Sequence, residues 1–365
     1  MKPRRIRPGG RWLLLLFLVW LAAPPWARAG EVELSNRAAI SLEYDDNVYK
    51  TNRDRTLDEL GRLFYDFGLH WAITPANLLL TNYQVGGKLY FHESDESAVI
   101  NQLQLGYTNS SLPTVQMGVL GSVKLRNVAD AQEDYLKWTG RAFAGKTFLQ
   151  SLYTGVHAEY SEFDYRGSSW YDYWTQLYGA EARYDYERVF SVGLGYDYEI
   201  KTYPYKALKD IGASDIVLVE ENDLRVDHLH EFSLSGRYQK TFFETLPFLA
   251  NLTYTYQVND SNSYGDSYNN HRVMLGLSQY IFQDTSVHFL GVFQFRNSAE
   301  KVLIPHSYSI EEDDENYNQI ELRLTHGFND YLSLFAGYHR YWSDSSFADL
   351  SFTKNLYALG LTVDF

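Results

Sequence analysis

The sequence contains no cysteine, which excludes a disulfide framework and any metal site built on thiolates. Beyond residue 23 it also lacks a long apolar run, and none approaches the roughly twenty residues that a membrane-spanning helix needs. If that part of the chain enters a membrane, it must do so as strands. Basic residues are in the minority, with 32 Lys and Arg against 46 Asp and Glu. This balance argues against nucleic acid as a partner.

The first 29 residues have the three-part plan of a secretory signal peptide. Basic residues from Lys2 to Arg11 precede an apolar run from Trp12 to Ala23, and Ala27 and Ala29 supply the small residues of a cleavage site. A transmembrane anchor is the alternative, but a run of about twelve residues is too short to span a bilayer. We therefore expect cleavage after Ala29 and a mature protein of residues 30–365, in which 26 basic and 46 acidic residues leave a net charge of −20.

Stretches in which apolar and polar residues alternate recur along the mature chain, and we count about sixteen of them. Examples are Arg37–Asp46 and Leu63–Ile73. Brief turns such as Thr74–Asn77 alternate with longer polar segments such as Asp260–Ser267. Tyr (31) and Phe (21) are abundant, which fits aromatic girdles at two membrane interfaces and would also fit a sugar-binding surface.

This alternation of short and long connections decides the fold class. A soluble sandwich has no reason to place every short turn at one end, whereas a bacterial outer-membrane barrel has short periplasmic turns, longer external loops and an even strand number. The sequence predicts an all-β fold: a single transmembrane antiparallel β-barrel of about 16 strands, with 14 to 18 compatible. We expect it in the outer membrane of a Gram-negative bacterium, enclosing an aqueous lumen.

The stretch Leu356–Phe365 is predicted to be the closing strand. Leu359, Leu361, Val363 and Phe365 share one face of an extended strand. Gly360, Val363 and Phe365 resemble the C-terminal signal that the barrel-assembly machinery reads, although Ala358 occupies a position that is usually polar. The resemblance implies that this machinery is a partner of the chain.

A second resemblance lies in residues 41–49, Ser-Leu-Glu-Tyr-Asp-Asp-Asn-Val-Tyr. They resemble the Tyr-Asp-Asp-Asn-Val-aromatic signature of the outer-membrane β-barrel porins associated with exopolysaccharide export, and are similar to the start of the barrel in surface-lipoprotein assembly modifiers. The resemblance implies transport of a surface polymer. From their chemistry alone, Asp45, Asp46 and Asn47 would cap a strand end and start a turn.

Once the outward rows are assigned, the inward rows follow by parity. The predicted inward basic residues are Arg37, Arg62, Lys88, Lys124, Arg126, Lys137, Arg141, Arg183, Lys201, Arg237, Arg272, Arg296, Arg323 and Lys354. The predicted inward acidic residues are Glu43, Asp45, Asp66, Glu159, Glu181, Asp185, Asp197, Glu199, Glu231, Glu321 and Asp364. A slightly basic lumen inside acidic loops favours anionic solutes, because rings of charged side chains set pore selectivity. The alternative is that these charges pair across strands and only keep the lumen wet.

The segment Thr202–Val226 is predicted to be the longest irregular stretch, and it contains the apolar run Ile216–Val219. Three roles remain open for it: a constriction or plug, a contact with a partner protein, or a short extra strand in an external loop.

No enzyme, metal site or cofactor is predicted. The ten His residues are scattered, and none lies in a context that resembles the catalytic sets of barrel lipases or proteases. His228 and His230 have a spacing that would suit a metal, but the sequence implies no third ligand. Asp260–Gly265 has part of a calcium-loop pattern without its final acidic ligand, so we interpret it as a turn.

The predicted function is an outer-membrane, porin-like channel for export of exopolysaccharide or passage of anionic solutes. The alternative is a barrel that acts as a scaffold or sheath for a surface lipoprotein or an electron-transfer protein. The expected partners are outer-membrane lipid and lipopolysaccharide, the barrel-assembly machinery and periplasmic polysaccharide-export proteins, with no nucleic acid.

Overall fold

A computed structural model of the chain describes residues 30–129, 134–166, 171–187, 189–212, 216–242, 246–298, 318–343 and 351–365. Residues 1–29, and with them the predicted signal peptide, lie outside the described residues. The described part contains no helix long and apolar enough to cross a membrane. A short 3-10 helix, η1, covers Ser94–Glu96.

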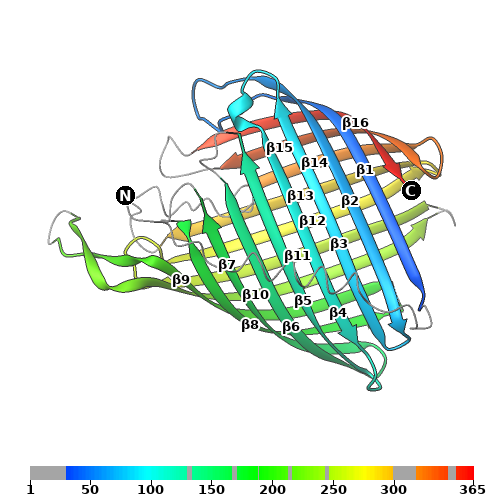
Figure 1. The fold of residues 1–365 in the computed structure, drawn as a ribbon, viewed down its shortest axis with the longest axis horizontal. Coiled ribbons are helices and arrows are strands. Elements are labelled where there is room, and N and C mark those ends of the chain that lie inside the picture. Colours follow the sequence, from blue (N-terminus) through cyan, green and yellow to red (C-terminus); the bar gives the residue numbers. More distant parts are fainter. Residues whose placement is uncertain are drawn as a thin grey trace, which may run out of the picture.

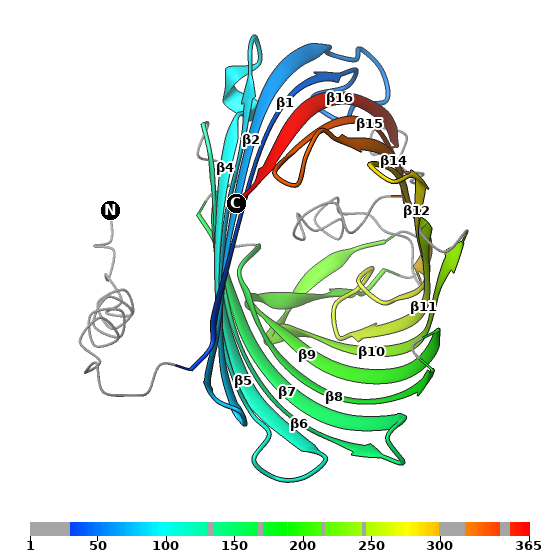
Figure 2. The same cartoon turned by 90° about the vertical axis from the view of Figure 1, so that its right-hand side faces the viewer.

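The described residues form sixteen β-strands in one closed antiparallel barrel, as the sequence predicts. In chain order they are β1 Val32–Asp45, β2 Asp58–Thr74, β3 Asn77–Tyr90, β4 Ala98–Asn109, β5 Val115–Val128, β6 Tyr135–Phe148, β7 Leu152–Tyr165, β8 Tyr173–Tyr186, β9 Phe190–Asp210, β10 Leu218–Phe242, β11 Leu246–Ser261, β12 Tyr268–Phe282, β13 Thr285–Ser298, β14 Asn318–Gly327, β15 Leu332–Ser343 and β16 Phe352–Asp364. Each strand pairs with its neighbours in sequence, and β16 pairs with β1 (Figure 2).

The two ends of the barrel differ in their connections. At one end, which we call the short-turn end, consecutive strands are joined by tight turns, such as Pro75 and Ala76 between β2 and β3. The other, the long-loop end, carries longer segments such as residues 46–57 between β1 and β2. The backbone of Asn36 exchanges two hydrogen bonds with Phe365, so β1 begins and β16 ends at the short-turn end (Figure 1).

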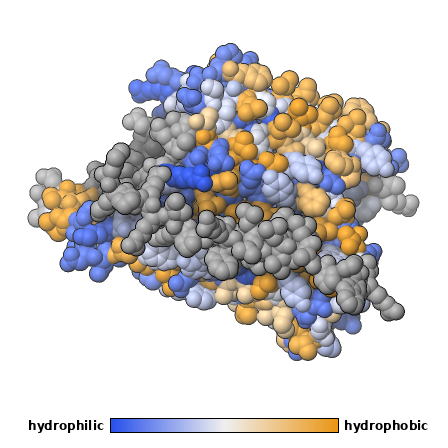
Figure 3. All heavy atoms as spheres, in the orientation of Figure 1, coloured by the Kyte–Doolittle hydropathy of each residue, from blue (hydrophilic) through white to orange (hydrophobic). Residues whose placement is uncertain are grey.

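Side chains alternate between the two faces of a strand, and the apolar residues lie on the face that points away from the barrel. In β1, Ile40 and Leu42 are more than half exposed, whereas Ser41 and Glu43, which alternate with them, are buried. Along the outer face hydrophobic side chains gather between more hydrophilic ends (Figure 3). The outer surface therefore has the composition of a surface that faces lipid.

The prediction of an irregular segment at Thr202–Val226 is wrong. Strand β9 continues to Asp210 and β10 begins at Leu218, so most of the segment is a β-hairpin that projects beyond the rim at the long-loop end (Figure 1). Pro204 lies where the β9–β10 register shifts, which is where a sheet tolerates a residue without an N–H. Residues 213–215 lie outside the described residues.

Candidate functional site: the inner wall of the barrel

The inner, concave face of the barrel is identified by a contact between strands that are not neighbours. The Tyr90 hydroxyl on β3 donates a 2.7 Å hydrogen bond to Asp45 on β1, passing over β2. Side chains two strands apart converge in this way on the concave face of a curved sheet. Directly paired residues share a face. The register therefore identifies the inner row of each of the remaining strands.

Followed around the barrel, the register places every charged residue that was predicted to point inward on this inner face. For example, Arg62 is paired with Lys88, Glu159 with Arg141, and Glu231 with Asp197. The last pairing, of Ala358 with Glu43, returns to the starting row without a change of face. Pairing thus determines which face of the sheet these side chains occupy.

Some inner-face charges are paired locally. Arg62 forms two hydrogen bonds with Glu43, at 2.8 and 2.9 Å, and Arg183 contacts Asp185 at 3.1 Å. Other charged groups have different partners: Glu231 accepts a hydrogen bond from Gln257, Arg237 donates one to Gln239, and Glu321 lies 3.6 Å from His339. The expectation that charges merely pair across strands therefore describes only part of the wall.

Several cations lie over aromatic rings instead. The guanidinium of Arg296 lies 3.6 Å from the centre of the Tyr268 ring, and that of Arg323 lies 3.8 Å from the centre of the Phe335 ring. The ammonium of Lys88 lies 5.1 Å from the centre of the Tyr90 ring. Such contacts stabilise a cation without neutralising its charge.

Charge on the inner face is segregated by strand. Within β3–β6, all of which the structure describes, the inner rows carry five cations and no Asp or Glu; the cations are Lys88, Lys124, Arg126, Lys137 and Arg141. The inner rows of β7–β10 carry six of the eleven acids that were predicted to point inward, beside three of the cations. The acids are Glu159, Glu181, Asp185, Asp197, Glu199 and Glu231, and the cations are Arg183, Lys201 and Arg237. The wall is therefore polarised from one side to the other, which the sequence alone did not reveal because neighbouring strands had not been placed.

The Asp-Asp-Asn segment joins the first strand to the last. Asp45 is fully buried and accepts the Lys354 ammonium at 2.6 Å, the Tyr90 hydroxyl and the backbone N–H of Asn47. Asp46 accepts two 2.6 Å hydrogen bonds from the backbone and side chain of Asn355 on β16. We call this group of contacts the seam cluster. It provides hydrogen-bond partners at the end of β1 and also joins β1 to β16.

Asn47 completes the seam cluster. Its side-chain amide donates to the carbonyl oxygens of Thr51 and Thr353, and its side-chain oxygen accepts the N–H of Thr51. Asn47 is fully buried. The capping role expected from Asp and Asn chemistry is therefore present, and the additional bonds to β16 could not be foreseen from local sequence.

The three residues of the predicted assembly signal differ in environment. Gly360 faces inward, and a Cβ atom there would meet the carbonyl oxygen of Ile40 and the ring of Phe335, so the close approach requires glycine. Val363 and Phe365 are exposed on the outer side. Ala358, the departure from the usual pattern, is buried on the inner wall.

An aromatic cluster on the inner wall was missed by the sequence analysis, which assigned aromatic residues to the membrane interfaces. Phe163 on β7 is 1% exposed and stacks on Tyr173, with the ring centres 5.0 Å apart. The cluster also contains Tyr135, Tyr165 and Tyr203. Alternation along the strand could have predicted the inward position of Tyr135, because Tyr135 shares its row with Lys137 and Arg141.

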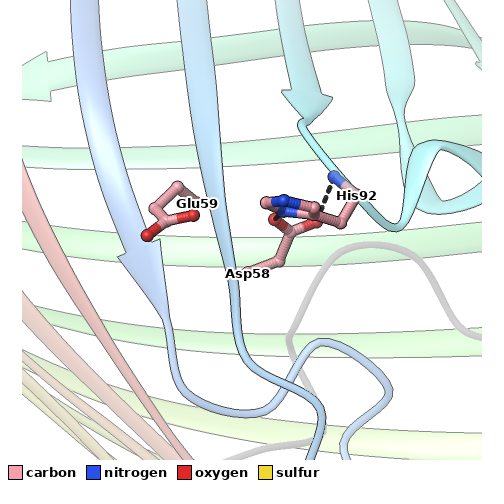
Figure 4. Close-up of side chains that lie close together, drawn as sticks. All are labelled: Asp58, Glu59 and His92. Carbon is pink, nitrogen blue, oxygen red and sulfur yellow. Dashed lines mark hydrogen bonds and ion pairs between the residues drawn. The ribbon is translucent and has the colours of Figure 1, made fainter.

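Asp58, Glu59 and His92 bring their potential ligand atoms within 4.8 Å of one another (Figure 4). The Asp58 carboxylate already accepts hydrogen bonds from the backbone N–H groups of His92 and Glu93 and contacts His92 Nδ1 at 2.8 Å. The bond to Asp58 raises the pKa of His92. These contacts, together with a 2.5 Å bond from the Tyr49 hydroxyl to Glu93, fix the β1–β2 and β3–β4 loops to each other.

The other candidate metal ligands have ordinary partners. His228 and His230 accept or donate hydrogen bonds with Tyr198 and Tyr196 on the outer face. The segment with part of a calcium-loop pattern forms the turn between β11 and β12. There the Asp266 carboxylate lies 3.0 Å from the Arg225 guanidinium, so an arginine supplies the positive charge.

No family model matches the sequence, and no curated protein matches it by sequence. Among solved structures, OmpF of Salmonella typhi in complex with daunomycin is similar, with a TM-score of 0.51 and 12% sequence identity over 92% of this chain and 98% of that one. CdiB from Acinetobacter baumannii has a TM-score of 0.50 and 10% identity, over 90% of this chain and 60% of that one. At these identities the similarity establishes the fold alone, a closed antiparallel β-barrel of the kind found in outer-membrane proteins.

Proposed function

We propose that this chain is an outer-membrane channel of a Gram-negative bacterium that passes hydrophilic solutes and prefers anions. The observation that carries the proposal is a closed barrel of sixteen strands with an apolar outer row and a charged inner row. Barrels of this strand number leave an aqueous passage. The apolar outer row fits lipid, and the charged inner row fits water and solute.

The anion preference is supported by the cations on β3–β6. Five inner-face cations without an acid among them create a positive sector along one side of the passage. Glu159 on β7 lies opposite Arg141 at the edge of this sector, and the other acids of β7–β10 lie on strands farther from it. An anionic solute therefore has a favourable path along one wall.

Export of an acidic surface polymer is the more specific form of this proposal, and it rests on the resemblance of residues 41–49 to the exopolysaccharide-associated porins. In this form residues 1–29 direct secretion, the barrel-assembly machinery inserts the barrel beside lipopolysaccharide, and periplasmic polysaccharide-export proteins deliver the polymer. The chain then acts as a conduit and not as an enzyme.

Reversal potentials in planar bilayers under a KCl gradient test the channel and its selectivity together. We expect an open pore with a preference for chloride over potassium. Changing Lys88→Gln and Arg141→Gln together should reduce this preference, since one charge at about 4 Å in water is worth about 1 kcal/mol, or about fivefold in local ion concentration. Arg53→Gln, an exposed position in the β1–β2 loop, is the matched control. Potassium preference, or no conductance, contradicts the proposal.

A scaffold for a partner protein is the second candidate, and the projecting β9–β10 hairpin favours it. Ile211 and Val217 near its tip are 61% and 48% exposed, which is unusual for apolar residues in water. A pore that stays closed, together with a partner that co-purifies only when this hairpin is intact, would support the scaffold over the channel.

A further inference from the structure

The inner wall is hollowed into a pocket of about 300 Å³ where β14, β15 and β16 meet β1 and β2. Small residues form its floor, chiefly Ala39, Gly337 and Ala358. Long side chains surround this floor; they are Glu43, Arg62, Phe64, Arg323, Phe335, His339 and Tyr341. The hollow is therefore produced by alternation of residue size along adjoining strands.

The two arginines of this wall pocket differ in their partners. Arg62 is neutralised by its two hydrogen bonds with Glu43. Arg323 lies over the Phe335 ring at 3.8 Å. Among the described residues the Glu321 carboxylate acts on its charge electrostatically but forms no ion pair with it. The pocket thus offers one guanidinium that can still bind a carboxylate through two parallel hydrogen bonds.

The remaining groups suit a sugar ring. The His339 imidazole lies in the lining and can exchange hydrogen bonds with ring hydroxyls. The Ser41 hydroxyl donates to Glu43, whose carboxylate also binds Arg62, so these groups form a polar wall beside the ring. Phe64 and Tyr341 provide aromatic surface for the apolar face of a ring. A volume of about 300 Å³ lies at the lower end of the range for small-molecule sites, which is suitable for one sugar unit.

We propose that the wall pocket is a binding site for one hexuronate unit, with Arg323 as the residue that recognises its carboxylate. The inference rests on the proposed function, because a solute reaches the pocket only through a water-filled interior. It adds a substrate class to that function: an acidic sugar or a polymer of acidic sugars that moves along this wall.

Binding of galacturonate trimer, measured by calorimetry on the folded barrel in detergent, tests the site without relying on conductance. We expect the trimer to bind at least about tenfold more tightly than maltotriose, a neutral trimer, because charge-assisted bidentate hydrogen bonds are the strong ones. Arg323→Gln should remove this difference. Arg340→Gln is the matched control, because Arg340 is on β15 in the outer row and lies 5.8 Å from the centre of the Trp342 ring.

A second variant separates loss of binding from loss of folding. Ala39→Leu should fill the floor of the pocket and weaken binding of the acidic trimer while every charge remains in place. Equal affinity for both trimers, or tight binding that survives both Arg323→Gln and Ala39→Leu, overturns the inference. A barrel that conducts ions but does not bind the trimer also overturns it and leaves the proposed channel standing. Binding at the pocket by a barrel that never conducts would instead contradict the channel.

Discussion

Asp45 is the residue on which most of the seam depends. Its carboxylate is fully buried and neutralises Lys354 of β16, which is itself 7% exposed. A buried charge is tolerated only when it is paired and hydrogen-bonded. The two residues therefore act as a unit that joins the ends of the sheet, and neither is expected to be stable there alone.

Asp45→Asn should destabilise the barrel by about 3 kcal/mol, because it removes the buried negative charge that lies 2.6 Å from the Lys354 ammonium. Unfolding in urea, followed by tryptophan fluorescence and by heat-modifiable migration in gels, measures the change. The double variant Asp45→Asn with Lys354→Met should recover most of the loss, since no buried charge remains. If the double variant is as unstable as the single one, the ion pair is not the source of the stability.

At the scale of residues, alternation groups the side chains of a strand into rows, but it does not specify their partners. Parity assigned Arg62 and Glu231 to rows that agree with the strand register, because alternation in a strand is a local property. The partners of Asp46 and Asn47 lie more than three hundred residues away on β16, and no local pattern specifies them. Phe163 and Tyr173 pack together for the same reason: the register, not the sequence, brings β7 beside β8.

Strands were predictable as elements because apolar and polar residues alternate along much of their length, as in β1. Their ends were less predictable, as β9 shows. Beyond Thr202 it continues into the hairpin, where Tyr203 and Tyr205 point to the same side and pack with Arg225 of β10. An inward aromatic row and a proline at a register shift are compatible with strand pairing, although the polar surroundings suggest a loop.

Removal of residues 206–224 tests the position of this hairpin. Because the hairpin projects beyond the rim, and Tyr203, Tyr205 and Arg225 remain at its base, single-channel conductance should stay within about twofold of the full-length value, as tolerated for exposed loop tips. Conductance is measured in planar bilayers on barrels that retain heat-modifiable migration. A several-fold rise would show that the hairpin occludes the passage.

The architecture of the whole molecule depends on the number of strands and on the closure of the sheet. The sequence predicts about sixteen strands, but it does not show how the first strand pairs with the last. Pairing of β1 with β16 gives every strand two neighbours and leaves no open edge, which a sheet in lipid requires. Closure also determines which strands lie side by side. It therefore creates the positive sector on β3–β6 and the wall pocket between β14 and β2, two features that belong to the assembled barrel and to no single segment.

The central claim is that one face of each strand meets water inside a membrane-embedded barrel and the other meets lipid. Neighbouring positions on β5 test it directly, because Val119 lies in the outer row and Leu120 in the inner row, paired with Gly106 and Arg141. The chain has no cysteine. In single Val119→Cys and Leu120→Cys variants, the introduced thiol is therefore the only one that a thiol reagent can modify.

The decisive measurement is the rate at which a charged, membrane-impermeant thiosulfonate modifies each variant in lipid vesicles. Leu120→Cys should react at least about tenfold faster than Val119→Cys, because reaction needs a hydrated, ionisable thiol, and its modification should reduce the single-channel current. Equal rates, or faster reaction at Val119→Cys, would contradict a water-filled barrel with these two faces.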